Sequence, residues 1–307
     1  MKLNGIHHVS CITGDAQLNV DFYTRVLGMR LVKKTVNQDD PSVYHLFYAD
    51  DQGNAGADLT FFEYPHAVRG RAGAGMIHTV VLRVASRDAL DFWQARLEVV
   101  GELDTVRRID DTRLAFNDPE GLGLELAVVD VPDAPLTAAR DDIPDDFRIQ
   151  GFDSVRAYAT RVEASRELFE QLLHFDAIAG DEATWDVRGA TRGGTFTFEP
   201  APEVPGRQGA GVVHHVAWAV PVQEHAAWAT YLAENGVHNT PVIDRHYFKA
   251  IYFREPNGVL FEIADVGSAG FAVDEDPAHL GEKLSLPPKF EPLREQIEPL
   301  LTPIVSA

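Results

Sequence analysis

The chain has one cysteine, little positive charge and no long apolar run. Because Cys11 has no intramolecular thiol partner, a disulfide framework is excluded, and we expect a protein of the reducing cytoplasm. No segment approaches the roughly 20 consecutive apolar residues that cross a bilayer, so we expect no membrane span. The first five residues lead directly into patterned sequence, so we also expect no signal peptide.

Lysine and arginine total 27 against 47 aspartate and glutamate residues, which gives a formal net charge of −20. A surface with this balance repels phosphate backbones and anionic lipid, which argues against nucleic acid and membranes as partners. The rest of the composition, 45% hydrophobic and 24% charged over 307 residues, is typical of a globular chain with a substantial core. It leaves open whether the chain forms a homo-oligomer.

The sequence contains an internal repeat. Residues 72–78 (AGAGMIH) resemble residues 208–214 (QGAGVVH), and residues 117–125 (NDPEGLGLE) resemble residues 254–262 (REPNGVLFE). Weaker copies open at Ile6 and Phe152, so four related units are predicted. We expect an N-terminal half, 1–131, with modules at 1–70 and 74–131. We expect a C-terminal half, 150–266, with modules at 150–201 and 210–266, followed by a tail, 267–307, that packs on the modules.

Each module has the pattern of one strand, one helix and three strands, so the predicted fold class is α+β. The first strand alternates apolar with small or polar residues, and capping residues such as Asp15 and Ser86 predict helix starts. In the first helix, Leu18, Phe22 and Val26 recur at i, i+4 and i+8, which predicts its buried face.

Two positions distinguish the modules. In the first strand the equivalent residues of modules one to four are His8, Thr79, Ser154 and His215, and in the last strand they are Thr60, Glu125, Thr197 and Glu262. Because side chains alternate faces along a strand, the large apolar residues should share a face with His7 and His214, toward the helix. The second histidine of each pair should then face an open cleft.

Combining two modules into one concave sheet brings four of these positions together. Only modules one and four give two histidines and one carboxylate, namely His8, His215 and Glu262, with Thr60 in the fourth position. This donor set is typical of non-haem iron(II) oxygenases. The sequence therefore predicts one metal site per chain.

The sequence resembles the vicinal oxygen chelate superfamily of βαβββ modules, and in particular its four-module ring-cleaving dioxygenases of the dichlorohydroquinone dioxygenase type. The segments that carry the resemblance are IHHVSCITGDAQLNVDFYTRVLGMRLVKKTVNQDDPSVYHLFYAD, GVVHHVAWAVP, DRHYFKAIYFREPNGVLFEIA and GFAVDEDPAHLGEKLSLPP. The resemblance implies two concave mixed-sheet barrels, with iron(II) bound by His8, His215 and Glu262. It also implies catalytic roles for His7, His214, Arg245 and Tyr252.

The expected activity is ring cleavage of a small hydroquinone- or catechol-type aromatic by O₂, with Fe²⁺ as the cofactor. Two alternatives remain open. A glyoxalase-like lyase or isomerase would generally use more carboxylate ligands, and Thr60 in the fourth position argues against it. A metal-free binding or resistance protein on the same fold would not need the His-His-Glu set.

Overall fold

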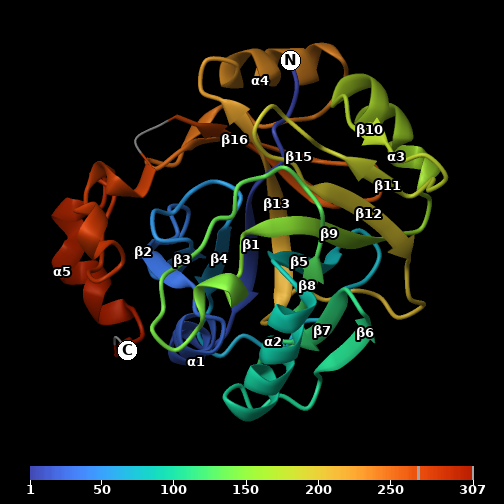
Figure 1. Cartoon of the computed structure of the whole chain (residues 1–307). Helices are drawn as coiled ribbons and strands as arrows, with labels where there is room; N and C mark the ends of the chain where they lie inside the picture. The colour runs from blue at the N-terminus through green and yellow to red at the C-terminus, as the bar shows by residue number, and fades with distance from the viewer. Residues whose placement is uncertain (268–269, 306–307) are drawn as a thin grey trace.

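The computed structural model describes residues 1–267 and 270–305. The chain forms four βαβββ modules, whose strands make two eight-stranded mixed sheets (Figure 1). The predicted class and module pattern are confirmed. None of the helices in the described ranges has the length and apolarity of a membrane-spanning segment.

The elements of modules one and four follow. Module one has β1 (Ile6–Thr13), α1 (Ala16–Asp21), the π-helical turn Phe22–Val26, β2 (Arg30–Val36), β3 (Tyr44–Ala49) and β4 (Asp58–Glu63). Module four has β13 (Val212–Pro221), α4 (His225–Glu234), β14 (Ile243–Asp244), β15 (Lys249–Arg254) and β16 (Leu260–Val266). Their strands form one sheet in the order β14-β15-β16-β13-β1-β4-β3-β2.

Modules two and three form the other sheet. Module two has β5 (Ile77–Val84), α2 (Arg87–Val99), β6 (Arg107–Asp110), β7 (Arg113–Asn117) and β8 (Gly123–Val128). Module three has β9 (Phe152–Ala159), α3 (Glu163–Glu167), the π-helical turn Leu168–Leu172, β10 (Asp176–Ala177), β11 (Thr184–Asp186) and β12 (Thr195–Pro200). Their order is β10-β11-β12-β9-β5-β8-β7-β6. A short 3₁₀ turn, Asp145–Phe147, lies between the modules.

The sheets join modules along antiparallel seams. Strand β1 pairs with β13, and β5 pairs with β9. Within each module the first strand is parallel to the last, as β1 is to β4 and β13 is to β16. The predicted pairing of module one with module four is therefore confirmed, and the seam places β16, β13 and β1 side by side.

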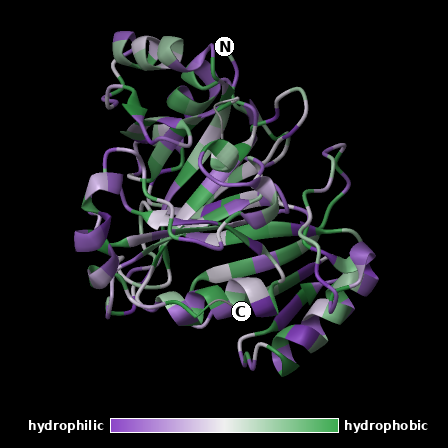
Figure 2. Ribbon diagram, turned by 90° about the vertical axis from the view of Figure 1, so that its left-hand side faces the viewer, coloured by the Kyte–Doolittle hydropathy of each residue, from purple (hydrophilic) through white to green (hydrophobic). Residues whose placement is uncertain are grey.

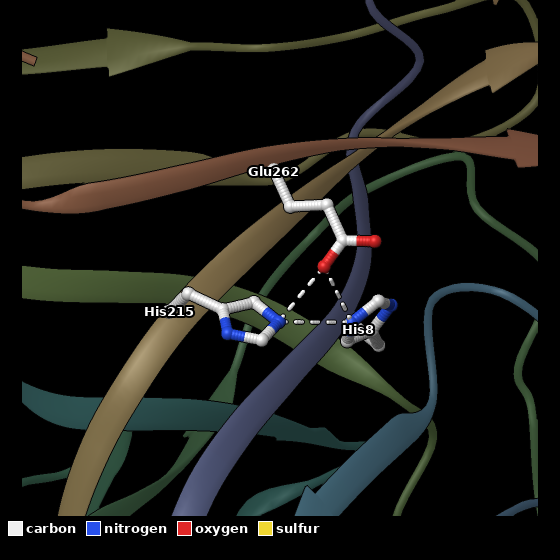
Figure 3. Close-up of side chains that lie close together, drawn as sticks. All are labelled: His8, His215 and Glu262. Atoms are coloured by element: carbon white, nitrogen blue, oxygen red, sulfur yellow. Dashed lines mark hydrogen bonds and ion pairs between the residues drawn. The ribbon is translucent and has the colours of Figure 1, made fainter. Parts of the chain in front are cut away.

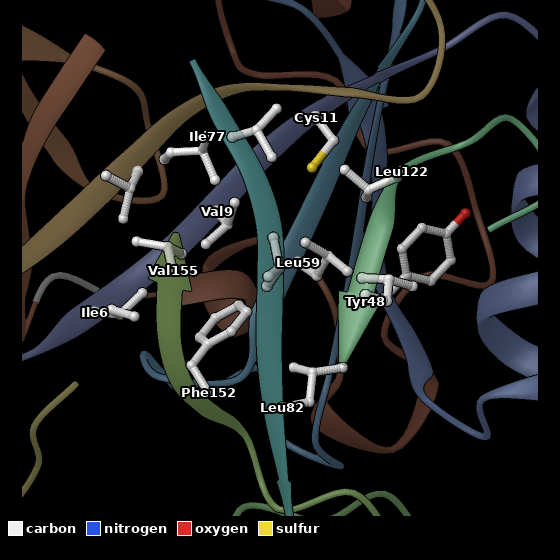
Figure 4. Close-up of a cluster of buried hydrophobic side chains, with 14 of the residues drawn as sticks. Ile6, Val9, Cys11, Tyr48, Leu59, Ile77, Leu82, Leu122, Phe152 and Val155 are labelled. Carbon is white, nitrogen blue, oxygen red and sulfur yellow. The ribbon is translucent and has the colours of Figure 1, made fainter. Parts of the chain in front are cut away.

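The main core lies between the two sheets. Figure 4 shows Ile6, Val9 and Leu59 of the first sheet packed with Ile77 and Val155 of the second. Each of these five side chains is at most 2% exposed, and burying an aliphatic side chain of this size contributes about 1.5–3 kcal/mol. Hydrophobic residues predominate on the central strands, while the peripheral helices contain both hydrophilic and hydrophobic residues (Figure 2).

The helix starts are those predicted. The Asp15 carboxylate accepts from the Leu18 amide at 2.9 Å, and the Ser86 hydroxyl accepts from Ala89 at 3.1 Å. The predicted buried face of the first helix is wrong at Leu18, which is 41% exposed. The chain changes from α-helix to a π-helical turn at Phe22, and the wider turn shifts the register of the buried residues.

The tail lies against the first sheet, at the left of Figure 1. Its described part contains the 3₁₀ turns Gly270–Val273, Pro277–His279, Glu291–Leu293 and Glu298–Leu300 and the short helix α5 (Arg294–Ile297). Lys34 of β2 forms an isolated bridge with Leu284, and the Ser285 amide donates to the Lys34 carbonyl at 2.9 Å. The tail thus covers the free edge of β2. Residues 268–269 and 306–307, which belong to the predicted tail, lie outside the described residues.

Candidate metal centre

Three neighbouring strands bring His8, His215 and Glu262 together (Figure 3). The His8 Nε2 and His215 Nε2 atoms are 3.3 Å apart, and Glu262 Oε2 lies 3.3 Å from the first and 2.8 Å from the second. Their exposed fractions are 1%, 3% and 0%. In the described parts of the chain, this is the only group of three such side chains whose donor atoms converge.

The strand register is irregular at both histidine pairs. Along the β1–β13 seam the pairing shifts between Ile6 and His8 on one strand, and between His215 and Val213 on the other. Each shift is a β-bulge, in which one extra residue interrupts the alternation of faces. The expectation that His7 and His214 face the helices is therefore wrong. Both lie beside the second histidine of their pair, on the cleft side.

The bulges place the first histidine of each pair against the second. The Nδ1 atoms of His7 and His8 are 3.0 Å apart, and those of His214 and His215 are 2.8 Å apart. Burial, followed by the neighbouring His8, lowers the pKa of His7 to about 3. The His7 ring is therefore neutral and can accept a hydrogen bond from His8. If His8 and His215 each carry a proton on Nδ1 and donate it to the adjacent ring, their Nε2 lone pairs point at the cluster centre.

The carboxylate of Glu262 lacks an ordinary partner. Neither of its oxygens accepts a hydrogen bond of good geometry from a described residue, and the two Nε2 atoms face Oε2 instead. Burial would raise the pKa of Glu262, but His8 and His215 hold it well below its usual range, so the group is ionised. Burial lowers the pKa of His215, against the opposing effect of its contact with Glu262.

An ionised carboxylate and two imidazole nitrogens, buried and converging on one point, form the donor set of a divalent cation. Buried polar atoms are normally satisfied, so the lack of donors at Glu262 is what a metal ligand would show in the absence of its ion. Two nitrogens and one oxygen on one side leave further coordination positions open toward the pocket. The residues therefore fit a 2-His-1-carboxylate metal site.

Tyr252 and Arg245 lie next to this group. Tyr252 pairs with Glu262 across β15 and β16, and its ring centroid is 5.6 Å from that of His215. Burial, followed by the Glu262 charge, raises the pKa of Tyr252 well above its usual value, so the phenol is protonated. The Arg245 guanidinium carbon lies 5.4 Å from the centre of the Tyr252 ring, and both of its terminal nitrogens contact Asp39 at 3.0 Å. Arg245 thus makes an ion pair and also faces the pocket.

The pocket beside the cluster contains residues that the sequence did not single out. His45 and Phe47 of β3 and Phe62 of β4 line it together with the three candidate ligands. Strand alternation could have identified them, because Tyr44, Leu46 and Tyr48 are the core residues of β3 and its other face carries His45 and Phe47. Phe248 also lines the pocket, with its ring centroid 5.0 Å from that of His8.

Thr60 takes the position in module one that Glu262 takes in module four, and its hydroxyl is already engaged in hydrogen bonds. Its hydroxyl lies 2.8 Å from the Ser10 hydroxyl and 2.9 Å from His45 Nε2. A hydroxyl held in this way is a poor substitute for a fourth carboxylate ligand.

In the second sheet, Glu125 takes the position equivalent to Glu262 but has different neighbours. Glu125, which is 2% exposed, contacts Arg113 Nη1 at 2.5 Å and Arg156 Nη2 at 2.5 Å. The two guanidinium groups supply positive charge where the first sheet gathers histidine nitrogens. Among the described residues, a converging set of metal-ligand atoms therefore occurs in the first sheet and not in the second.

The tail closes one side of the concave sheet. The Phe271 ring lies 4.9 Å from Phe47 and 5.5 Å from Tyr247, and all three belong to one buried apolar cluster on the cleft side. Lys33 of β2, with 0% of its side chain exposed, pairs with Asp274 at 2.6 Å and also contacts Glu275. Apolar contacts and buried ion pairs therefore fix the tail beside the pocket.

Known proteins share this architecture over nearly the whole chain. The sequence profile of the Glyoxalase/Bleomycin resistance protein/Dioxygenase superfamily matches residues 5–126 and 151–263. Ring-cleaving dioxygenase MhqA of Bacillus subtilis (strain 168) is 40% identical, with 99% of this chain and 100% of the relative covered. Chlorohydroquinone/hydroquinone 1,2-dioxygenase of Sphingobium indicum is 31% identical, with 96% and 95% covered.

Solved structures agree. A dioxygenase crystal structure from Bacillus subtilis superposes with a TM-score of 0.90 at 36% identity and covers 99% of this chain and 98% of its own. Glyoxalase I from Zea mays superposes with a TM-score of 0.58 at 15% identity, covering 85% and 92%, which shows a common fold. The chain therefore belongs to the glyoxalase/bleomycin resistance protein/dioxygenase superfamily.

Proposed function

We propose that the protein is an iron(II)-dependent dioxygenase that cleaves the ring of a hydroquinone-type aromatic and inserts both atoms of O₂. The observation that carries the proposal is the buried cluster of His8, His215 and Glu262, whose donor atoms converge without other partners. The relatives named as ring-cleaving and hydroquinone dioxygenases support the reaction class. Iron(II) bound there would supply a redox-active centre that activates dioxygen toward the ring.

The surrounding residues would prepare the substrate. Tyr252, a protonated phenol beside Glu262 and His215, would act as a general acid that donates its proton to a substrate oxygen. Arg245 would stabilise negative charge on that oxygen until it is protonated. His7 and His214 would hold the ligand imidazoles in one tautomer and orientation.

The pocket walls would exclude water from the reacting ring. Phe47, Phe62 and Phe248 present aromatic surface around the cluster, and the tail closes the side next to Phe47. An aromatic diol buries its ring well against such walls. A glyoxalase-like reaction is disfavoured, because Thr60 replaces the additional carboxylate and is itself hydrogen-bonded.

The decisive experiment is anaerobic loading of the protein with iron(II), followed by oxygen uptake with substituted hydroquinones and catechols. We expect one equivalent of oxygen consumed per diol and a ring-opened product that carries both oxygen atoms when ¹⁸O₂ is supplied. Glu262→Ala is the inactive control. Iron-loaded protein that binds the metal but consumes no oxygen with any diol would contradict the proposal.

A further inference from the structure

His45 is a polar residue in an aromatic part of the pocket wall. Its ring centroid lies 3.9 Å from that of Phe47 and 4.2 Å from that of Phe62. Its Nε2 atom is 2.9 Å from the Thr60 hydroxyl, which is in turn 2.8 Å from the Ser10 hydroxyl. Two ring contacts and one hydrogen bond therefore fix both the plane and the rotation of the imidazole.

The other ring nitrogen is available. His45 Nδ1 makes no hydrogen bond to a described residue, and the side chain is only partly buried and lines the pocket. Burial lowers the pKa of His45 well below its usual value, so the ring is neutral and carries one donor and one acceptor nitrogen. Whichever role Nε2 takes toward Thr60, Nδ1 offers the opposite one to a ligand.

The neighbouring polar groups of the wall are already engaged. The side-chain oxygen of Asn37 accepts from the Asp39 backbone amide at 2.9 Å, and its side-chain nitrogen donates to the Tyr64 hydroxyl at 3.4 Å. Gln38 donates to the Arg245 carbonyl, and Asp39 pairs with the Arg245 side chain. These contacts lie within the protein. Among the described residues, two polar groups of this wall make no such contact: His45 Nδ1 and the hydroxyl of Thr35, which stands opposite His45 on β2. Of the two, only His45 has a ring fixed by aromatic contacts on both sides.

The two sides of the pocket differ in chemistry. Across β15 and β16, Tyr252 stands opposite Glu262, whereas across β3 and β4 the corresponding pair is Phe47 opposite Thr60. The phenol therefore stands on the module-four side, and an apolar ring takes its place on the module-one side. The module-one side offers aromatic surface and the single neutral imidazole of His45.

We infer that His45 binds the second hydroxyl of a para-diol through Nδ1 while the first hydroxyl lies at the His8–His215–Glu262 cluster, so that His45 selects hydroquinones over catechols. The inference rests on the proposed function. In a hydroquinone the two hydroxyls are at opposite ends of the ring, so a ring with one end at the cluster needs a polar partner at its far end. A catechol keeps both hydroxyls at one end and leaves His45 unsatisfied, which costs affinity.

The first test compares steady-state turnover of hydroquinone and catechol by the iron-loaded protein. His45→Phe keeps an aromatic ring between Phe47 and Phe62 but removes the hydrogen bond. We expect KM for hydroquinone to rise about tenfold with kcat unchanged, since one net hydrogen bond of about 1.4 kcal/mol corresponds to that factor. KM for catechol should not rise, and any change should be a decrease, because the variant removes the polar group that catechol leaves unsatisfied. His45→Gln, whose carboxamide offers both a donor and an acceptor, should recover part of the lost selectivity.

The matched control is Val36→Ala, which trims an apolar residue of the same pocket. It should weaken both diols alike and leave their ratio of kcat/KM as in the parent protein. A His45→Phe protein with the parent ratio would overturn the inference, as would a Val36→Ala protein with the selectivity loss of His45→Phe.

A second measurement separates this inference from the proposed function. Titration calorimetry on the zinc-loaded protein, which does not turn over, compares hydroquinone with phenol. We expect the parent protein to bind hydroquinone about tenfold more tightly and His45→Phe to bind both equally. No oxygen uptake with any diol would refute the proposed function while this binding difference still tests His45. Equal binding of both ligands by the parent protein would refute the role of His45 alone.

Discussion

Glu125→Ala tests whether the equivalent positions of the two sheets differ in function, with the proposed metal ligand Glu262 in the first sheet and an ion-paired carboxylate in the second. The substitution leaves Arg113 and Arg156, with side chains 37% and 22% exposed, without their buried carboxylate. Breaking a fully buried ion pair costs about 3–5 kcal/mol, and the partial exposure of both arginines reduces this to about 2 kcal/mol. The cofactor should be unaffected, because neither arginine belongs to the metal cluster.

Calorimetry and metal analysis on the same preparation provide the assay. For a chain of 307 residues, a loss of about 2 kcal/mol should lower Tm by about 3 °C, while iron content and kcat stay at parent values. The matched control is Glu199→Ala, because Glu199 is 41% exposed and 3.3 Å from the same Arg156, and its loss should leave Tm unchanged. Loss of iron from Glu125→Ala would refute the pairing of modules one and four as the source of the ligands.

The remaining predictions concern the first sheet. His215→Ala should abolish iron retention and turnover while the fold, judged by circular dichroism, persists; full iron occupancy would remove it from the ligand set. Tyr252→Phe should lower kcat by roughly 10²–10⁴ with unchanged iron, as for other general acid–base groups, and full activity would reduce it to a packing residue. Asp39→Asn should release Arg245 and lower kcat/KM about two- to fivefold, the equivalent of an exposed pair worth about 0.5–1 kcal/mol. Asp40→Asn, one residue further along the same loop, should have no effect, and equal losses in both variants would point to loop folding.

Strand periodicity and the internal repeat predicted the part of the structure that depends on equivalent positions. Comparison of four modules predicted which of them share a sheet, and the structure places His8, His215 and Glu262 in one cluster. A repeat makes this possible because each position occurs four times, with different residue types in different modules. The roles of these residues as iron ligands, and those of Tyr252 and Arg245 in catalysis, stay predictions.

Local irregularities were not predictable in the same way. The β-bulges that turn His7 and His214 into the cleft arise from the pairing of β1 with β13. Gly5 and Gly211 precede the two histidine pairs, but a glycine before a strand does not by itself show that the strand contains an extra residue. The spacing of apolar residues also gives no sign of the π-helical turn that leaves Leu18 exposed. The contacts of Lys33 with the tail, about 240 residues away in sequence, depend on the finished fold.

The seam between β1 and β13 has a consequence for how the chain matures. His8 and His215 are separated by 207 residues, and Glu262 lies further still toward the C-terminus. During synthesis the first module leaves the ribosome with β1 as an unpaired sheet edge. This edge stays unpaired until the last module has been synthesised and β13 can pair with it. If the cluster binds iron as proposed, metal binding is tied to the final step of assembly, and nascent or truncated chains lack the complete ligand set. The same geometry lets a bound ion hold the two ends of the polypeptide together, which predicts that apo-protein opens first along this seam.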